Sequence, residues 1–249
     1  MERVMKVAET QPRVYSDVIT INVDVQNDFA LLDGALSVRD GEKVIEPLNQ
    51  INEWTRANNG QVVFTRDYHP LNTRHFAKHG GPWPVHCVAG TSGAEIHKDL
   101  RVSTGDIIAN KGMGTEDDGY SGWYATTDEG LSVGSLVSRR AFEYRKAVAE
   151  RGGTLKEERP IAVLIGGLAT DYCVKATCLD AYRDSVSAYK DADFIIDIYL
   201  LRDAVRAVNL QDGDELRALD AIYAARVQAI SVRDVIAGGI TIDHHRLEV

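Results

Sequence analysis

The sequence of 249 residues is poor in cysteine and has no excess of basic residues. Its three cysteines show no CxxC spacing, which argues against a disulfide scaffold and favours a reducing compartment. The formal net charge of −9 argues against nucleic-acid and anionic-membrane partners, because both favour basic patches. The segment Met1–Asp17 mixes charges with few apolar side chains and predicts neither a secretory signal nor a transmembrane helix. We therefore expect a cytoplasmic protein with no nucleic-acid or membrane partner.

The hydrophobic content of 44%, without internal repeats, low-complexity tracts or linkers, predicts a single domain over residues 1–249. Apolar strand-like runs alternate with helical patterns, as a parallel sheet with crossover helices requires. Right-handed crossovers would place helices on both faces of that sheet. In the C-terminal part, the expected strands are Asp193–Leu200 and Val227–Ile230, and the expected helices are Asp214–Ala225 and Val232–Ala237.

A candidate nucleophile follows an apolar run that stops at two glycines. The run Ile161–Ile165 has the length and β-branched content of a strand buried on both faces, and the glycines are expected to end it. Thr170 or Asp171 would then cap a helix with Cys173 in its first turn, where the macrodipole favours a thiolate. Cys173 equally fits the role of a small buried hydrophobic residue, so other segments must decide.

Two other predicted strands end in charged residues. The segment Ile19–Phe29 delivers Asp24, and the segment Asp106–Gly112 delivers Lys111. Ligands of open parallel sheets bind beyond the carboxyl ends of the strands, so both side chains should face the crevice of Cys173. Alone, Asp24 also fits a turn and Lys111 a solvated surface. Together with a thiol they make chemical sense, because the carboxylate can accept the thiol proton while the ammonium holds the carboxylate.

A further cluster of polar residues follows the predicted strand Gln61–Thr65. Asp67 and His69 lie two residues apart on an extended segment, and His86 can return across a proline-stiffened loop to complete a three-ligand site. Such ligands, with open positions, suit Zn²⁺, Fe²⁺ or Mn²⁺. A hydrogen-bonded surface loop explains the same residues, so the metal site is a hypothesis.

These motifs occur in a specific order along the chain. They are VDVQNDF with Asp24, TRDYHP with Asp67 and His69, GGPWPVHC with His86, NKG with Lys111, DGYSGW with Tyr120, and GLATDYCVKAT with Cys173. This ordered set resembles the nicotinamidase branch of the isochorismatase-like cysteine hydrolases. The resemblance runs from about Ile19 to about Ile230.

The resemblance implies a doubly wound, mostly parallel α/β sheet and a catalytic triad of Asp24, Lys111 and Cys173. It implies hydrolysis of nicotinamide to nicotinate and ammonia through a cysteine thioester, in NAD salvage. It also implies a cis peptide between Leu168 and Ala169, with the N–H groups of Ala169 and Cys173 forming an oxyanion hole.

The resemblance assigns Asp67, His69 and His86 to a divalent metal, most commonly zinc, which binds the pyridine nitrogen of the substrate. It implies a small-molecule amide as the substrate and a homo-oligomer as the assembly.

The resemblance also places three aromatic residues around a flat substrate, namely Phe29, Trp83 and Tyr120. Ordinary core packing explains Phe29 about as well, whereas the Pro-Trp-Pro context of Trp83 argues for a loop.

One motif departs from the family pattern. Nicotinamidases usually carry Asn-His-x-Ser-Phe after the DxHP motif, whereas this chain has Asn72–Phe76 with the sequence NTRHF. We expect that a serine or histidine contact near the metal is lost, and that Arg74 could meet an acidic substrate instead.

The segment of about residues 121–155 is long for a simple connection. Ser138–Arg151 predicts a charged amphipathic helix, which fits a lid or helical insertion, a subunit contact or, by default, a plain crossover.

Other functions remain as alternatives. The altered Asn72–Phe76 segment fits a related cysteine hydrolase acting on an N-carbamoyl, ureido or maleamate-like amide. A non-hydrolytic thiol or metal-binding protein would use Cys87, Cys173 and Cys178, but it would leave Asp24 without a role. An isochorismate-type vinyl ether hydrolase needs no cysteine nucleophile.

Overall fold

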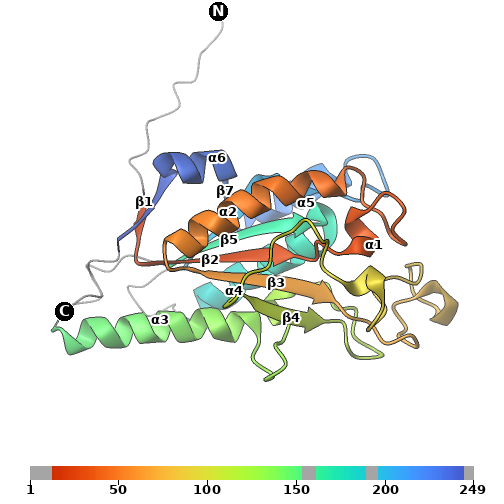
Figure 1. Cartoon of the computed structure of the whole chain (residues 1–249), viewed down its shortest axis with the longest axis horizontal. Helices are drawn as coiled ribbons and strands as arrows, with labels where there is room; N and C mark the ends of the chain where they lie inside the picture. Colours follow the sequence, from red (N-terminus) through yellow and green to blue (C-terminus); the bar gives the residue numbers. More distant parts are fainter. Residues whose placement is uncertain (1–12, 153–160, 189–195, 244–249) are drawn as a thin grey trace, which may run out of the picture.

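A six-stranded parallel sheet organises the computed structural model, which describes residues 13–152, 161–188 and 196–243 (Figure 1). The strand order is β4-β3-β2-β5-β6-β7, and β1 pairs with β8 in a separate parallel ladder. The strands are β1 (Arg13–Tyr15), β2 (Asp17–Val23), β3 (Gln61–Asp67), β4 (Ile107–Lys111), β5 (Ile161–Leu168), β6 (Asp197–Arg206), β7 (Gln228–Ile230) and β8 (Ile240–Ile242). The predicted doubly wound fold is confirmed.

Helices cover both faces of this sheet. They are α1 (Asn27–Ala30), α2 (Ile45–Ala57), α3 (Val133–Glu150), α4 (Lys175–Ala188), α5 (Asp214–Ala224) and α6 (Val232–Asp234). Short 3₁₀ turns span Gly41–Val44, Ala77–His79, Ser92–Ala94 and Gly122–Tyr124, and π-helical turns span Thr170–Val174 and Val235–Gly239. No helix among the described residues has the length and apolar character needed to cross a bilayer.

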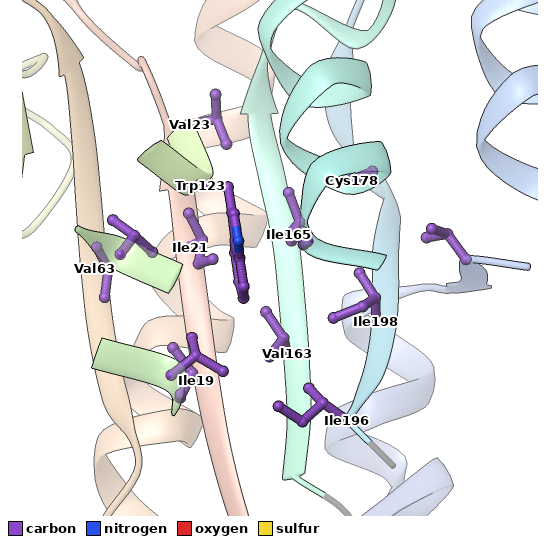
Figure 2. Packing of buried hydrophobic residues seen from close by; sticks show 14 of the residues in the cluster. Ile19, Ile21, Val23, Val63, Trp123, Val163, Ile165, Cys178, Ile196 and Ile198 are labelled. Atoms are coloured by element: carbon purple, nitrogen blue, oxygen red, sulfur yellow. The ribbon is translucent and has the colours of Figure 1, made fainter. Parts of the chain in front are cut away.

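Two hydrophobic cores form because alternate strand residues point to opposite faces. Ile19 and Ile21 of β2 pack with apolar residues of α3 and α4, and Figure 2 shows Trp123 between Ile21 and Ile165. Val18 faces the other way and belongs to the core beneath α2. Figure 1 shows α2 and α6 along the upper side of the sheet and α3 along the lower side.

Strand β5 differs from the expectation that its two glycines would end it. The strand continues to Leu168, and Gly166 and Gly167 pair with the last residues of β2. Gly167 has a φ of 123°, and a Cβ on it would lie 2.1 Å from the carbonyl oxygen of Val23. Gly167 therefore allows β5 to lie close to β2 instead of breaking the strand.

The other boundaries shift by a few residues. Helix α3 begins five residues before the predicted Ser138, because the side chain of Ser132 accepts a hydrogen bond from the backbone N–H of Ser135 as an N-cap. Helix α3 follows β4 and precedes β5 along the chain. Its buried residues, including Val137 and Ala141, pack on the sheet. The first 12 residues, the first part of the predicted strand Asp193–Leu200, and residues 153–155 of the long segment lie outside the described residues.

Candidate active site

The carboxyl ends of neighbouring strands deliver four functional side chains to one place. Asp24 directly follows β2, Asp67 and Lys111 are the last residues of β3 and β4, and Cys173 lies in the turn after β5. Asp67 and Lys111 are register partners across the β3–β4 ladder. All four side chains are buried. Parallel strands end at the same edge of the sheet, so the sheet topology alone brings these residues together.

Lys111 is the centre of this group. Its Nζ lies 2.8 Å from Oδ2 of Asp24 and 3.5 Å from Sγ of Cys173. The same ammonium donates to the carbonyl oxygen of Gly119 at 2.6 Å and contacts Asp67. One buried cation thus holds two carboxylates beside a thiol, which is the combination that the sequence predicted for Asp24, Lys111 and Cys173.

The charges in this group shape its proton affinities. Burial raises the pKa of Asp24 to about 6, although the ammonium of Lys111 opposes the shift. Burial alone would lower the pKa of Lys111, but Asp24 and Asp67 raise it well above its ordinary value. Lys111 therefore stays protonated, and Asp24 is a base poised close to neutral pH.

Cys173 does not match the thiolate predicted from its position. Burial raises the pKa of its thiol well above the ordinary value, and Asp24 and Asp67 raise it further against the opposing effect of Lys111. The turn Thr170–Val174 is π-helical, and neither Thr170 nor Asp171 caps it with its side chain. Asp171 instead accepts hydrogen bonds from the backbone N–H groups of residues 208 and 209, both at 2.9 Å. The thiol therefore needs a base, and Asp24 is in place to serve as one.

A cluster of three buried imidazoles lies beside the carboxylate of Asp67. One ring nitrogen from each of His69, His75 and His86 lies within 4.8 Å of the others. Nε2 of His69 is 3.5 Å from Oδ2 of Asp67, and Nε2 of His86 is 3.9 Å from the same oxygen. The structure thus brings the predicted set of Asp67, His69 and His86 together and adds His75.

Hydrogen bonds orient these rings toward a common point. Nδ1 of His69 lies 2.9 Å from the carbonyl oxygen of Gly112, and Nδ1 of His86 lies 2.8 Å from that of Pro84. This leaves Nε2 of both rings facing Asp67, and Nε2 of His69 is buried with no hydrogen-bond partner among the residues that the structure describes. Gly112 has a φ of 63°, and a Cβ there would lie 2.3 Å from the His69 ring, so only glycine fits.

This donor set fits a divalent metal ion. Burial lowers the pKa of His86 and lowers the pKa of His75 to about 4, so both rings are neutral and carry a free lone pair at neutral pH. Neutral imidazoles with one carboxylate are typical ligands of Zn²⁺, Fe²⁺ and Mn²⁺. The carbonyl partners of the other ring nitrogens are what metal-binding histidines normally have.

A pocket is lined by residues of both groups. The predicted aromatic residues Phe29, Trp83 and Tyr120 all line it, together with Cys173. Nε1 of Trp83 donates to the hydroxyl of Tyr120 at 2.9 Å, and this bond fixes two of the walls. The other lining residues are Leu36, Val38, Asp67, His75, His86, Leu168, Ala169, Tyr172 and Val208. The pocket is small and mostly apolar, and suits one flat ring.

The loop before the cysteine has the backbone feature implied by the resemblance. The peptide bond between Leu168 and Ala169 is cis, and both residues line the pocket beside Cys173.

The segment Asn72–Phe76, which differs from the family pattern, does not place a positive charge in the pocket for an acidic substrate. Arg74 is 73% exposed and forms an ion pair of 2.9 Å with Glu116, and it does not line the pocket. The neighbouring His75 enters the imidazole cluster, so the segment supplies a histidine contact where we expected a loss. The three cysteines are free and buried, and Cys87 and Cys178 do not line the pocket of Cys173.

Sequence patterns missed several residues that support the site. Thr65 donates to Oδ1 of Asp24 at 2.6 Å, and Gln26 bonds to the backbone of Asp67. Tyr172 packs edge-to-face on Trp83, with ring centroids 4.9 Å apart. The available signal was their position within the motifs, because Gln26 lies in VDVQNDF, Thr65 in TRDYHP and Tyr172 in GLATDYCVKAT.

Comparisons with known proteins agree with this geometry. A family model described as the isochorismatase domain matches residues 18–126. A nicotinamidase of Acinetobacter baylyi is 31% identical over 232 residues, which cover 87% of this chain and 93% of that protein. The pyrazinamidase of Pyrococcus horikoshii in complex with zinc is 32% identical, with a TM-score of 0.64 and coverage of 86% of this chain and 98% of that chain. PnC1 from L. infantum in complex with nicotinate is 27% identical, with a TM-score of 0.65 and coverage of 92% and 96%.

Proposed function

The chain belongs to the isochorismatase-like superfamily, in its nicotinamidase branch, and we propose on this premise that it hydrolyses nicotinamide to nicotinate and ammonia. One observation carries the proposal. A single small pocket with aromatic walls is lined by Cys173, whose neighbours are the buried Lys111 and Asp24, and by Asp67, His75 and His86 of the imidazole and carboxylate cluster. A thiol with a base acts on a carboxamide, and the aromatic walls select a flat ring.

Acyl transfer to Cys173 is the first half of the proposed reaction. Asp24 takes the proton from the thiol, and the sulfur attacks the carboxamide carbon to form a tetrahedral adduct. The backbone N–H groups of Ala169 and Cys173 stabilise the negative charge on the oxygen. Asp24 then gives its proton to the amide nitrogen as the C–N bond breaks, which leaves a thioester and free ammonia.

Hydrolysis of the thioester is the second half. Asp24, ionised again, takes a proton from water as the water attacks the thioester carbon. Collapse of the adduct breaks the C–S bond, and Asp24 returns the proton to the sulfur of Cys173, releasing nicotinic acid, which gives its own proton to the solvent to form nicotinate. Lys111 remains protonated throughout, because two carboxylates hold it, and it keeps Oδ2 of Asp24 in position.

We propose that Asp67, His69, His75 and His86 hold a divalent metal ion, with zinc as the first candidate and Fe²⁺ or Mn²⁺ as alternatives. When bound, such an ion supplies a Lewis acid that anchors the ring nitrogen of the substrate. The ring centroid of Phe29 lies 5.4 Å from that of His86, so Phe29 would pack on the pyridine ring of the substrate.

The decisive experiment measures ammonia release from nicotinamide by the purified protein, with and without a chelator. Cys173→Ala should abolish release, whereas Cys178→Ala, the same change at a buried cysteine outside the pocket, should retain it. Activity retained by Cys173→Ala would refute the thioester mechanism. A panel of N-carbamoyl, ureido and maleamate-like amides tests the alternative substrates. Arg74, which was one reason to consider them, pairs with Glu116 at the surface and so gives them no support.

We also propose that the chain is a single domain that forms a homo-oligomer. The described residues share one main sheet with a core on each face, which supports the single domain. Phe142 on α3 is 65% exposed, and we choose it as the position at which to test for a contact between copies. Light scattering of the wild type and of Phe142→Ser tests the assembly, and a monomeric wild type would contradict it.

A further inference from the structure

The two carboxylate oxygens of Asp24 have different partners. Oδ1 accepts a hydrogen bond from the hydroxyl of Thr65 at 2.6 Å, and Oδ2 lies 2.8 Å from Nζ of Lys111. Asp24 is 0% exposed and Thr65 is 1% exposed, so both oxygens are enclosed by protein. The carboxylate therefore has two chemically distinct oxygens when it acts as a base.

This difference determines where a proton can be held. A hydroxyl that donates a hydrogen bond to Oδ1 makes that oxygen a poorer site for a proton. Oδ2 lies near the ammonium of Lys111 but accepts no hydrogen bond from the described residues, so it can take a proton, and the same ammonium contacts Sγ of Cys173. We propose that Thr65 is a positioning residue, whose hydroxyl engages Oδ1 and so reserves Oδ2 for the reaction proton. In that step the S–H bond of Cys173 breaks and an O–H bond forms at Oδ2.

Gly122 lies beside Thr65, and its lack of a side chain leaves room for the threonine in this orientation. A Cβ at Gly122 would lie 3.1 Å from Cγ2 of Thr65 and 3.3 Å from its Oγ1. The N–H of Gly122 donates to the hydroxyl of Thr177 at 2.8 Å, and that hydroxyl donates to the carbonyl oxygen of Cys173 at 2.6 Å. The same glycine thus packs on the threonine that holds the base and is bonded to the threonine that holds the nucleophile.

The proposal deepens the proposed function and rests on it for the step in which Asp24 protonates the leaving ammonia. Its other step, removal of the thiol proton, can be measured without substrate. The charged and titratable groups that face Asp24 are Lys111, Asp67 and Cys173. The Thr65 hydroxyl adds a donor that favours the ionised form of the carboxylate.

The test compares three variants of the metal-loaded protein. Thr65→Val removes the hydroxyl with little change of shape, and Thr65→Ser keeps it. Thr20→Val is the matched control, because Thr20 is a buried threonine on β2 whose hydroxyl pairs with Thr55 at 2.6 Å, away from Asp24. Circular dichroism and metal content establish that each variant is folded and loaded. Thr65→Ala replaces Thr65→Val if the valine variant does not fold.

The readout is the pH dependence of alkylation of Cys173 by iodoacetamide, with the modified residue identified by peptide mass mapping. Thr65→Val should move the midpoint of the acidic limb upward by about one pH unit, because a lost hydrogen bond to a charged group changes an equilibrium about tenfold. Thr65→Ser and Thr20→Val should keep the wild-type midpoint. Nicotinamide turnover by Thr65→Val at pH 5, below the pKa of the base, should show kcat reduced about tenfold with KM unchanged.

An unchanged midpoint in folded, metal-loaded Thr65→Val would overturn the proposal. An equal shift in Thr20→Val would also overturn it, as would a shifted midpoint in Thr65→Ser. A wild type without nicotinamide turnover, but with the predicted shift in Thr65→Val, would refute the proposed function and support the role of Thr65.

Discussion

Replacing Gln26 tests how the end of β2 supports the candidate metal site. Strand β2 stops pairing with β3 at Asn22 and Phe64, so the backbone of Asp67 has no strand partner on that side. The side-chain amide of Gln26 takes this place. Its Oε1 accepts from the N–H of Asp67 at 2.8 Å, and its Nε2 donates to the carbonyl oxygens of Asp67 at 2.7 Å and Ala94 at 2.8 Å.

The expected effect of Gln26→Leu follows from these three bonds. The residue is 0% exposed, so the substitution leaves one buried N–H and two buried carbonyl groups without their partner. At about 1 kcal/mol for each group, the free energy of unfolding should fall by about 3 kcal/mol. That corresponds to a decrease in Tm of about 6–12 °C for a chain of this size. Because Asp67 would lose its anchor, metal affinity should fall about 10–100-fold.

Denaturant unfolding of the metal-free protein and competition with a chelator measure these two effects separately. Gln50→Leu is the matched control, because the side chain of Gln50 on α2 bonds, within the described part of the chain, to the exposed side chain of Glu46 alone. That change should alter the free energy of unfolding by less than about 0.5 kcal/mol. If Gln26→Leu binds metal and unfolds as the wild type does, Gln26 does not anchor Asp67 and the reasoning is refuted.

Three further predictions concern the same site. Burial raises the pKa of Asp24 to about 6, so kcat/KM should fall about tenfold per pH unit below pH 6 as the base becomes protonated, and a rate independent of pH between 5 and 7 would contradict its role. His75→Ala should lower metal affinity at least about tenfold, whereas His79→Ala, at an exposed histidine, should not, as equilibrium dialysis with metal analysis would show. Gly112→Ala should displace the ring of His69 and reduce bound metal, and wild-type metal content would contradict the close approach described here.

The sequence was informative about the fold because strands buried on both faces must be apolar throughout. The run Ile161–Ile165 and the segment around Ile19 therefore identified β5 and β2, the two central strands. It was misleading about where β5 ends. Glycine is equally suited to a turn and to close contact between strands, and only the nearness of Val23 distinguishes the two.

Electrostatic properties could not be predicted from position along the chain. The first turn after β5 suggested a thiolate at Cys173, but burial and two nearby carboxylates have the larger effect. These carboxylates come from β2 and β3, far away in sequence. A pKa depends on all charges within a few ångströms, and the sequence does not list those neighbours.

The sequence by itself determined that strands alternate with helices along the chain, that Asp24 and Lys111 follow strand-like runs, and that a nucleophile, a base and a cation have complementary chemistry. The tertiary structure decided which residues complete them. His75 joins the imidazole cluster, Arg74 turns outward to Glu116, and Thr65 engages one oxygen of Asp24. Strand-end positions are fixed by hydrophobic periodicity, which is local, whereas loop side chains take their places by packing and hydrogen bonding with segments distant in the chain.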